Sequence, residues 1–222
     1  MFYIASIVRH ATFAALILLM TDGLCVTDDK EDRLADGALF DSVSIYAGQG
    51  VNHNFRELPS RVINSDLDWE KAYFHALGFG KAEKTLGKSF DILHETQFPS
   101  LFQGYEVVLV QHVGLQNNVE VGAAYTLKTS QLQVGLIEID FSSGVGLSYA
   151  FGYPSYEDGA EDNPQRRYRL QILALFDFEW RLRKFENTSI IVRVHHRSGG
   201  YGLIAPTQVG SNFLVTGIRY KF

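Results

Sequence analysis

The sequence predicts an all-β protein, namely an eight-stranded antiparallel transmembrane β-barrel. Two observations support this fold class. Polar and apolar residues alternate along most of the chain after residue 40, which is the period of a β-strand and not of a helix. The alternating segments are joined by hairpin-short connections or by stretches rich in Gly, Pro, Asn and Asp.

Two segments carry the alternation most clearly. In 119–128, "VEVGAAYTLK", one face is apolar and the other holds Glu120, Thr126 and Lys128. In 169–183, "RLQILALFDFEWRLR", every second residue from Leu170 to Leu182 is apolar. No comparable pattern occurs at helical spacing, so both segments are predicted to be strands.

The complete pattern gives eight predicted strands. They span roughly 41–50, 69–80, 104–116, 118–128, 133–150, 168–183, 187–199 and 211–222. The connections at 116–118 and 129–131 are short enough for hairpins, whereas those at 51–68, 152–167 and 200–210 are longer. The segment 81–103 is compatible with a long loop or with a short helix.

The N-terminal 25 residues have the features of a secretory signal peptide. Arg9 and His10 precede an apolar run at 11–20, and small residues, Gly23 and Cys25, stand at the −3 and −1 positions of a cleavage site. The expected organisation is therefore a signal peptide at 1–25 and a single barrel domain at 26–222. A retained membrane anchor is the alternative. Because Cys25 is the only cysteine, cleavage after it leaves a chain without disulfides, thiol nucleophiles or cysteine metal ligands.

The composition limits the partners of the protein. A formal net charge of −5 provides no basic surface, so nucleic acid is not expected to bind. Charged residues make up only 20% of the chain, while 13% of the residues are aromatic. This balance suits a chain with much apolar surface and few charges.

Alternation alone fits a soluble barrel as well as a membrane barrel, since both have one apolar face. The final segment, "FLVTGIRYKF", resembles the closing strand of bacterial outer-membrane proteins, which ends in Phe after apolar residues at alternate positions. Several predicted strands also reach the length of 9–11 residues that a tilted spanning strand needs. We therefore expect a bacterial outer-membrane protein, with a soluble lipocalin-like carrier as the alternative.

The faces of the segment 187–199 suggest where a functional site lies. Arg193, His195 and Arg197 share one face, and charged side chains at these positions are expected to point into a polar lumen. Their expected partners are acidic residues on neighbouring strands: Glu138, Asp140, Asp177 or Glu179. His196 and Ser198 then face outward, in line with Val192 and Val194.

The predicted topology also gives their height in the membrane. With the N-terminus in the periplasm, the seventh strand runs outward, so His196 and Ser198 lie near the cell-exterior rim. Asn212 opens the eighth strand at the same end and on the same outward face. Residues two apart on a strand are separated by about 6.6 Å, a gap that a leaning imidazole can span toward a serine hydroxyl.

At these residues the chain resembles the lipid A 3-O-deacylase (PagL-type) family of outer-membrane enzymes. The similarity runs mainly from about Gly144, "GVGLSYAFGYPSYE", to Phe222, and "VHHRSGGYGLI" and "GSNFLVTGIRYKF" are its most telling parts. Members are eight-stranded barrels that remove an acyl chain from the lipid A of lipopolysaccharide. The resemblance implies that Ser198 is the nucleophile and His196 the general base.

The sequence departs from this family at the acidic member of the site. The family has a Glu early in the eighth strand, but no Asp or Glu follows Glu186 here, and Asn212 falls near that place. An amide can hold an imidazole in one tautomer, although it brings no negative charge. Asn212 is therefore the expected orienting residue of a catalytic set with Ser198 and His196.

The remaining expectations concern the other groups of the site. The backbone amides of Gly199 and Gly200 are the expected oxyanion donors, since glycine lets a backbone N–H approach a substrate closely. No cofactor is implied, and the histidines show no metal-ligand spacing. The expected partner is lipid A, or lipopolysaccharide, in the outer leaflet. The alternative function is a catalytically silent barrel with a structural or binding role.

A loop at 156–163, "YEDGAEDN", gathers acidic side chains close to the expected lipid surface. The preferred interpretation is a solvated acidic loop, and the alternative is Ca²⁺ binding through carboxylate oxygens. The residues concerned are Glu157, Asp158, Glu161 and Asp162.

Overall fold

A computed structural model describes residues 38–85, 101–129, 132–157 and 168–222. The expected signal peptide at 1–25, most of the 81–103 segment, and Asp158, Glu161 and Asp162 lie outside these ranges. Within them, no helix is long and apolar enough to cross a membrane.

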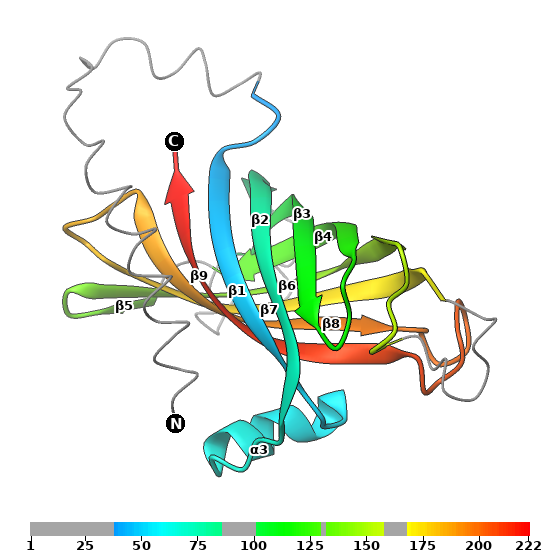
Figure 1. The fold of residues 1–222 in the computed structure, drawn as a ribbon. Helices are drawn as coiled ribbons and strands as arrows, with labels where there is room; N and C mark the ends of the chain where they lie inside the picture. The colour runs from blue at the N-terminus through cyan, green and yellow to red at the C-terminus, as the bar shows by residue number, and fades with distance from the viewer. Residues whose placement is uncertain (1–37, 86–100, 130–131, 158–167) are drawn as a thin grey trace, which may run out of the picture.

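The described residues form one closed antiparallel β-barrel (Figure 1). Strands that follow each other along the chain pair with each other, and the pairing of β1 with β9 joins the two ends. The strands are β1 (Ser42–Val51), β2 (Trp69–Thr85), β3 (Leu101–Gly114), β4 (Val119–Thr129), β5 (Leu132–Val134), β6 (Ile137–Phe151), β7 (Leu170–Leu182), β8 (Thr188–Ser198) and β9 (Gly210–Lys221). Because β5 has only three residues and β4 pairs directly with β6, the barrel wall has eight strands. The predicted fold class is confirmed.

The predicted strand at 133–150 is wrong at its start. The chain reverses at 135–136, between β5 and β6, and not at the predicted hairpin connection of 129–131. Gly135 adopts φ 62°, a left-handed conformation that suits glycine at a tight turn. The alternation changes phase at this turn, because the apolar residues Leu136 and Ile137 are adjacent, and the predicted strand ran across this break.

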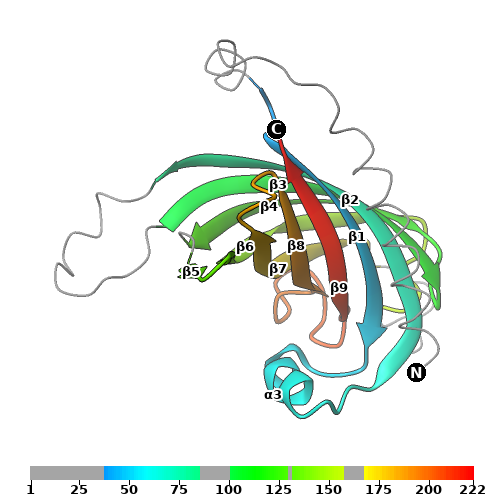
Figure 2. The ribbon, with the colours of Figure 1, turned by 90° about the vertical axis from the view of Figure 1, so that its left-hand side faces the viewer.

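The connection between β1 and β2 is more ordered than predicted. It contains a short 3-10 helix, η1 (Phe55–Glu57), followed by α3 (Leu58–Ile63), with Pro59 in the first turn of α3. Proline is well tolerated there because the first amides of a helix have no intrahelical acceptor. Figures 1 and 2 show α3 set apart from the strands, where β1 ends and β2 begins.

The outer surface of the barrel is apolar. Many large apolar side chains on outward-facing positions are exposed: Ile45, Leu77, Leu109, Val121, Tyr125, Phe141, Val145, Leu147, Leu170, Phe176, Ile190 and Val192. A soluble carrier would hold its apolar face inside, so this polarity contradicts that alternative. The protein is a membrane barrel of the outer-membrane type.

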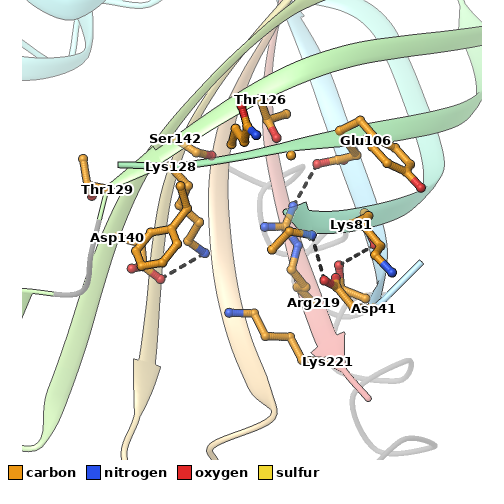
Figure 3. A pocket seen from close by; sticks show the side chains of 17 residues that line it. Asp41, Lys81, Glu106, Thr126, Lys128, Thr129, Asp140, Ser142, Arg219 and Lys221 are labelled. Atoms are coloured by element: carbon orange, nitrogen blue, oxygen red, sulfur yellow. Dashed lines mark hydrogen bonds and ion pairs between the residues drawn. The ribbon is translucent and has the colours of Figure 1, made fainter. Parts of the chain in front are cut away.

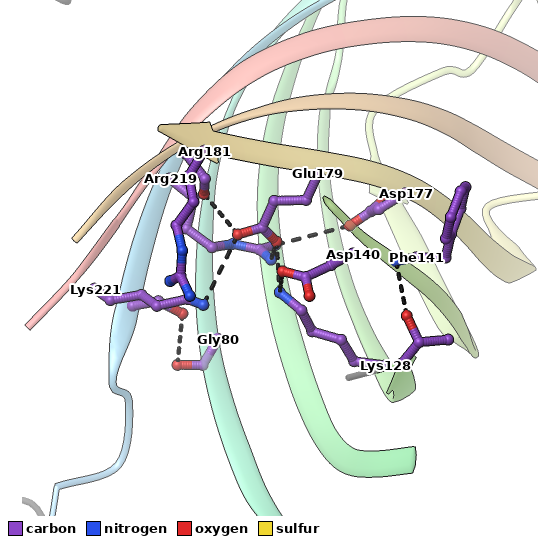
Figure 4. A network of polar contacts seen from close by, with 12 residues as sticks. Gly80, Lys128, Asp140, Phe141, Asp177, Glu179, Arg181, Arg219 and Lys221 are labelled. Carbon is purple, nitrogen blue, oxygen red and sulfur yellow. Dashed lines mark hydrogen bonds and ion pairs between the residues drawn. The ribbon is translucent and has the colours of Figure 1, made fainter. Parts of the chain in front are cut away.

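Buried ion pairs cross the lumen. Arg193 on β8 donates to Asp177 on β7 at 2.6 and 2.7 Å and to Glu106 on β3 at 2.7 and 2.8 Å. Arg219 on β9 also donates to Glu106, at 2.9 Å, and to Glu179, at 2.8 Å. Figure 4 shows Arg219 of β9 close to Glu179 and Asp177 of β7. Such pairs satisfy charges that would be very unfavourable if buried alone.

The predicted lumenal faces are correct, but most of the predicted partners are not. Arg193, His195 and Arg197 are all buried inside the barrel. Of the four acids expected to pair with them, only Asp177 does so among the described contacts. His195 instead contacts Glu120 at 3.2 Å, and Arg197 pairs with Glu157. The reason is that the closed barrel brings β8 opposite β3 and β4, and alternation does not reveal which strands face each other across the lumen.

Toward the end of the barrel where β8 finishes, the lumen is filled by aromatic rings. Phe74 packs against Phe213 with ring centres 5.0 Å apart, and against His195 at 5.2 Å. His112 shares Glu120 with His195, at 2.9 Å. The lumen is therefore not polar throughout, and its side chains pack as a core.

Candidate active site

His196 and Ser198 lie on the outer face of β8, at the end of the strand. The burial of alternate residues along β8 places both side chains on the side opposite to Arg197. His196 is directly opposite Asn212 on β9, and Ser198 is opposite Gly210. The β-sheet register therefore brings the three expected catalytic residues to one side of the wall.

Asn212 joins His196 to the connection between β1 and β2. The Nδ1 atom of His196 lies 2.7 Å from Oδ1 of Asn212, and Nδ2 of Asn212 donates to the carbonyl oxygen of His53 at 2.8 Å. Because Nδ2 is committed as a donor to that carbonyl, Oδ1 must face the imidazole and accept a hydrogen bond from it. Nδ1 therefore carries the proton, and Nε2 is left as the basic nitrogen of His196.

This arrangement is shielded on its outer side. Asn212 faces outward, yet it is only 8% exposed, because the β1–β2 connection covers it. Phe55 of that connection packs on the His196 ring at 4.7 Å between ring centres, and on Phe176 at 5.1 Å. The imidazole is thus held by a hydrogen bond at its edge and by an aromatic ring against its face.

Ser198 is not engaged by His196. No hydrogen bond joins these two described side chains, which are about 6.6 Å apart at the backbone because they are two residues apart on one strand. Catalytic hydrogen bonds are often long before substrate binds, so a rotation of Ser198 or His196 on binding would be needed to close the gap.

The two expected oxyanion donors differ in the structure. The N–H group of Gly199 already donates to the carbonyl of Val209 at 3.2 Å, so it is not available to a substrate in this conformation. Gly200 has φ 64°, and no acceptor for its N–H group is found among the described residues. Gly200 is therefore the better placed of the two.

A polar cavity of about 410 Å³ opens at this site. Its lining includes His53, Phe55, Tyr156, His196, Ser198 and Asn212. Burial, together with the negative charges of Glu70, Glu157 and Asp68, raises the pKa of Tyr156 to about 12. Its hydroxyl is therefore protonated at neutral pH, and Tyr156 is not the base of this cavity.

An apolar groove of about 830 Å³ lies beside the polar cavity, on the outer wall. Phe55 lines both spaces. The other lining residues come from α3 and from β1, β2, β6, β7, β8 and β9, mostly at outward-facing positions. A polar cavity with a base and a hydroxyl thus opens next to an apolar surface large enough for a lipid chain.

The opposite end of the lumen holds a third cavity, of about 480 Å³ (Figure 3). Its lining is charged, but the charges pair with each other. Lys128 contacts Asp140 at 3.0 Å and Glu179 at 2.7 Å, and Arg219 contacts Glu106 at 2.9 Å. No histidine lines this cavity, so it lacks the combination of base and nucleophile found at the rim.

Two residues of the site were missed by the sequence analysis. His53 and Phe55 lie in the β1–β2 connection, where no periodicity indicates which way a side chain points. Glu157 was assigned to the acidic loop, but it is buried and accepts hydrogen bonds from Ser211 at 2.6 Å and from Gln116 at 3.1 Å. It therefore belongs to the lumenal network and not to a solvated surface.

Comparison with known proteins supports the fold. No model of a protein family matches the sequence, and no curated protein matches it. Among solved structures, that of the outer membrane enzyme PagL matches 82% of this chain and 99% of its own, with a TM-score of 0.55 and 13% sequence identity. Ail, the attachment invasion locus protein of Yersinia pestis, has a TM-score of 0.24 at 14% identity, which is too low to support an argument. The chain is thus an eight-stranded outer-membrane barrel that shares the fold of PagL.

Proposed function

We propose that this barrel is an ester hydrolase that removes an acyl chain from the lipid A of lipopolysaccharide. The observation that carries the proposal is the hydrogen bond of 2.7 Å between His196 and Asn212, on the same outward rim as Ser198. It fixes the tautomer that leaves Nε2 of His196 as a base. The structural likeness to PagL, an outer membrane enzyme, supports the same class of function.

The proposed chemistry proceeds in two steps. Nε2 of His196 takes the proton of Ser198, whose oxygen attacks the ester carbonyl, and the imidazolium then protonates the departing sugar hydroxyl. A water molecule, deprotonated by the same nitrogen, releases the fatty acid from Ser198. The N–H group of Gly200 is the proposed donor to the negatively charged oxygen of both tetrahedral intermediates. The imidazolium formed from this water then protonates the oxygen of Ser198. The net reaction is hydrolysis of the ester by one water molecule, and it requires no cofactor.

The substrate class follows from the position of the site. His196 and Ser198 face away from the lumen, on an apolar wall that contacts lipid. If the N-terminus of the barrel is periplasmic, this rim is level with the outer leaflet, where lipopolysaccharide resides. The scissile bond is then the ester that joins an acyl chain to the polar part of lipid A.

The proposal is tested by the mass of lipid A from cells that express the protein. Wild type should produce lipid A that lacks one acyl chain, whereas Ser198→Ala and His196→Ala should leave the lipid intact. Ser143→Ala is the matched control, since Ser143 is an exposed, outward-facing serine on β6, two strands from β8, and lines neither the polar cavity nor the apolar groove. Intact lipid A in cells with correctly assembled wild-type protein would contradict the proposal.

A catalytically silent barrel is the second candidate. It is favoured by the neutral amide of Asn212 in place of an acid and by the missing hydrogen bond between Ser198 and His196. In that case the rim would bind lipid without changing it, and the same mass measurement would find no difference between wild type and Ser198→Ala.

A further inference from the structure

We propose that His53, in the connection between β1 and β2, is a positioning residue that determines which nitrogen of His196 carries the proton. This inference rests on the proposed hydrolase function, and it adds a residue that acts on the base from outside the catalytic set. His53 makes two separate contacts in the structure. Its main-chain carbonyl oxygen accepts a hydrogen bond from Asn212, and its side chain accepts another from the N–H group of Asp68.

The carbonyl oxygen of His53 decides which way round the amide of Asn212 lies. The two ends of an amide side chain have nearly the same shape, so packing alone would let either end face His196. Nδ2 of Asn212 donates to this carbonyl at 2.8 Å, and a carbonyl oxygen only accepts. Turning the amide round would place Oδ1 against the carbonyl oxygen and lose this bond. Oδ1 therefore stays toward Nδ1 of His196, at 2.7 Å.

The side chain of His53 holds that carbonyl in place. Its Nε2 atom accepts a hydrogen bond from the main-chain N–H group of Asp68 at 2.9 Å. A main-chain N–H group only donates, so Nε2 of His53 is the unprotonated nitrogen of its ring. Two further hydrogen bonds join Asn52 to Asp68, one between main-chain groups at 2.9 Å and one between side chains at 3.3 Å. Because Asp68 directly precedes β2, residues 52 and 53 are fixed to the start of that strand.

The same segment carries the aromatic ring that packs on the base. Phe55 begins η1 two residues after His53, and its ring centre lies 4.7 Å from that of His196. His53 is half-buried and lines the polar cavity together with His196 and Asn212. A continuous series of contacts thus runs from Asp68 through His53 and Asn212 to the base.

Loss of the acceptor on His53 should release the carbonyl and let the amide of Asn212 turn. The turned amide presents Nδ2 to His196, so Nδ1 must accept, and the ring proton moves to Nε2. Since Nε2 is the nitrogen that takes the proton of Ser198, this tautomer is inactive. One hydrogen bond shifts such an equilibrium by about two- to tenfold, which sets the size of the expected effects.

The first measurement is the tautomer of His196, which does not depend on catalysis. Protein labelled with nitrogen-15 at histidine is purified in detergent, and NMR shows which imidazole nitrogen carries the proton. The signals of His196 are identified by their absence in His196→Gln. Wild type should show the proton on Nδ1 alone, whereas His53→Leu should show both tautomers. Leucine fills the space of the imidazole without an acceptor, and His53→Ala replaces this variant if it does not assemble.

A conservative variant and a matched control separate positioning from general loosening of the connection. His53→Gln places an amide oxygen near the position of Nε2, so it should restore the single tautomer. Ser60→Ala removes a hydrogen bond of 2.8 Å to the carbonyl of Glu57 in the same connection, and Ser60 lines neither the polar cavity nor the apolar groove. It should behave as wild type. Heat-modifiable migration on gels shows whether each variant has assembled.

The second measurement is acyl release from lipopolysaccharide micelles. His53→Leu should lower kcat about two- to tenfold with KM nearly unchanged, because the change lies in the base and not in contacts that bind the lipid. His53→Gln should recover the rate of wild type.

The two measurements separate the inference from the function on which it rests. A second tautomer in His53→Leu that is absent from His53→Gln would support the positioning role, even in a protein that hydrolyses no lipid. A proton on Nδ1 alone in both His53→Leu and His53→Ala would overturn this role, whatever the rate of hydrolysis. Equal amounts of the second tautomer in His53→Leu and His53→Gln would also overturn it, because the acceptor would then not be the cause.

Discussion

Replacing Asn212 with Asp should accelerate the reaction. In the structure Oδ1 of Asn212 accepts from Nδ1 of His196 at 2.7 Å, and the carboxylate of an aspartate can keep this contact because the side chain has the same length. The new charge stabilises the imidazolium that forms when Ser198 loses its proton. Asn212→Glu tests the same idea with a longer side chain.

The size of the gain can be bounded from this distance. Two unit charges about 4 Å apart near a protein surface interact by about 4 kcal/mol, which corresponds to a rate increase of about a thousandfold. The amide already fixes the tautomer of His196, so the full factor of about 10⁴ known for acid-to-amide changes in serine proteases is not expected. The carboxylate must also lose hydration at this shielded position, which reduces the gain further, and we expect about 10- to 1,000-fold.

The same substitution should lower stability. Nδ2 of Asn212 donates to the carbonyl of His53 at 2.8 Å, and a carboxylate would place a second acceptor there. Loss of this bond costs about 1–3 kcal/mol in the resting enzyme and in the transition state alike. It should therefore reduce the melting temperature without cancelling the gain in rate.

The assay is acyl release from lipopolysaccharide micelles by purified wild type, Asn212→Asp and Asn212→Ala over a range of pH. A nearby negative charge favours the protonated imidazole, so the acid limb of the pH profile should move to higher pH in the Asp variant. Asn212→Ala should be slower than wild type. A folded Asn212→Asp protein with an unchanged rate and an unchanged pH profile would refute the role assigned to Asn212.

Three further predictions concern assembly and stability. Phe176→Arg should make the free energy of membrane insertion less favourable by about 2–4 kcal/mol. Ile172→Arg should have a smaller effect, because Ile172 pairs with Ser198 at the rim. Heat-modifiable migration on gels measures the assembly of both variants. Arg193→Met should destabilise the barrel by about 3–5 kcal/mol, because it leaves the buried carboxylates of Glu106 and Asp177 without this partner. Urea titration in detergent measures the change, and an unfolding midpoint equal to that of wild type would contradict the importance of the network. Gly199→Ala should lower the melting temperature, because a methyl group there would overlap the carbonyl oxygen of Ala205. An unchanged melting temperature would contradict this steric argument.

The strands and their faces were predictable because a membrane barrel imposes one simple rule along each strand. Every second side chain faces lipid. The outward position of His196 and Ser198 was therefore predictable from the charged residues Arg193 and Arg197, which occupy the alternate positions of the same strand. The facing of His195 and Arg197 into the lumen followed in the same way. These features depend only on residues that are close in the sequence.

The rest depends on contacts between distant segments. Glu106 and Glu120 lie on the inner faces of β3 and β4, yet their pairing with β8 depends on how the barrel closes. The cover that Phe55 and α3 place over the rim lies in a connection with no periodic signal. The turn at Gly135 was missed because the alternation resumes directly after the adjacent apolar residues Leu136 and Ile137.

The ion pairs of the lumen also bear on the order in which the barrel can assemble. Arg219, near the C-terminus, donates to the hydroxyl of Ser44 at 3.0 Å and to Glu106 at 2.9 Å, so it joins the first, third and last strands. Neither contact can form while the sheet is open, and until then Glu106 lacks its partner on the last strand. A partly inserted barrel therefore remains hydrated inside and weakly held. The contacts of Arg219 form only when β9 pairs with β1, so closure of the barrel is the step that completes the lumenal network.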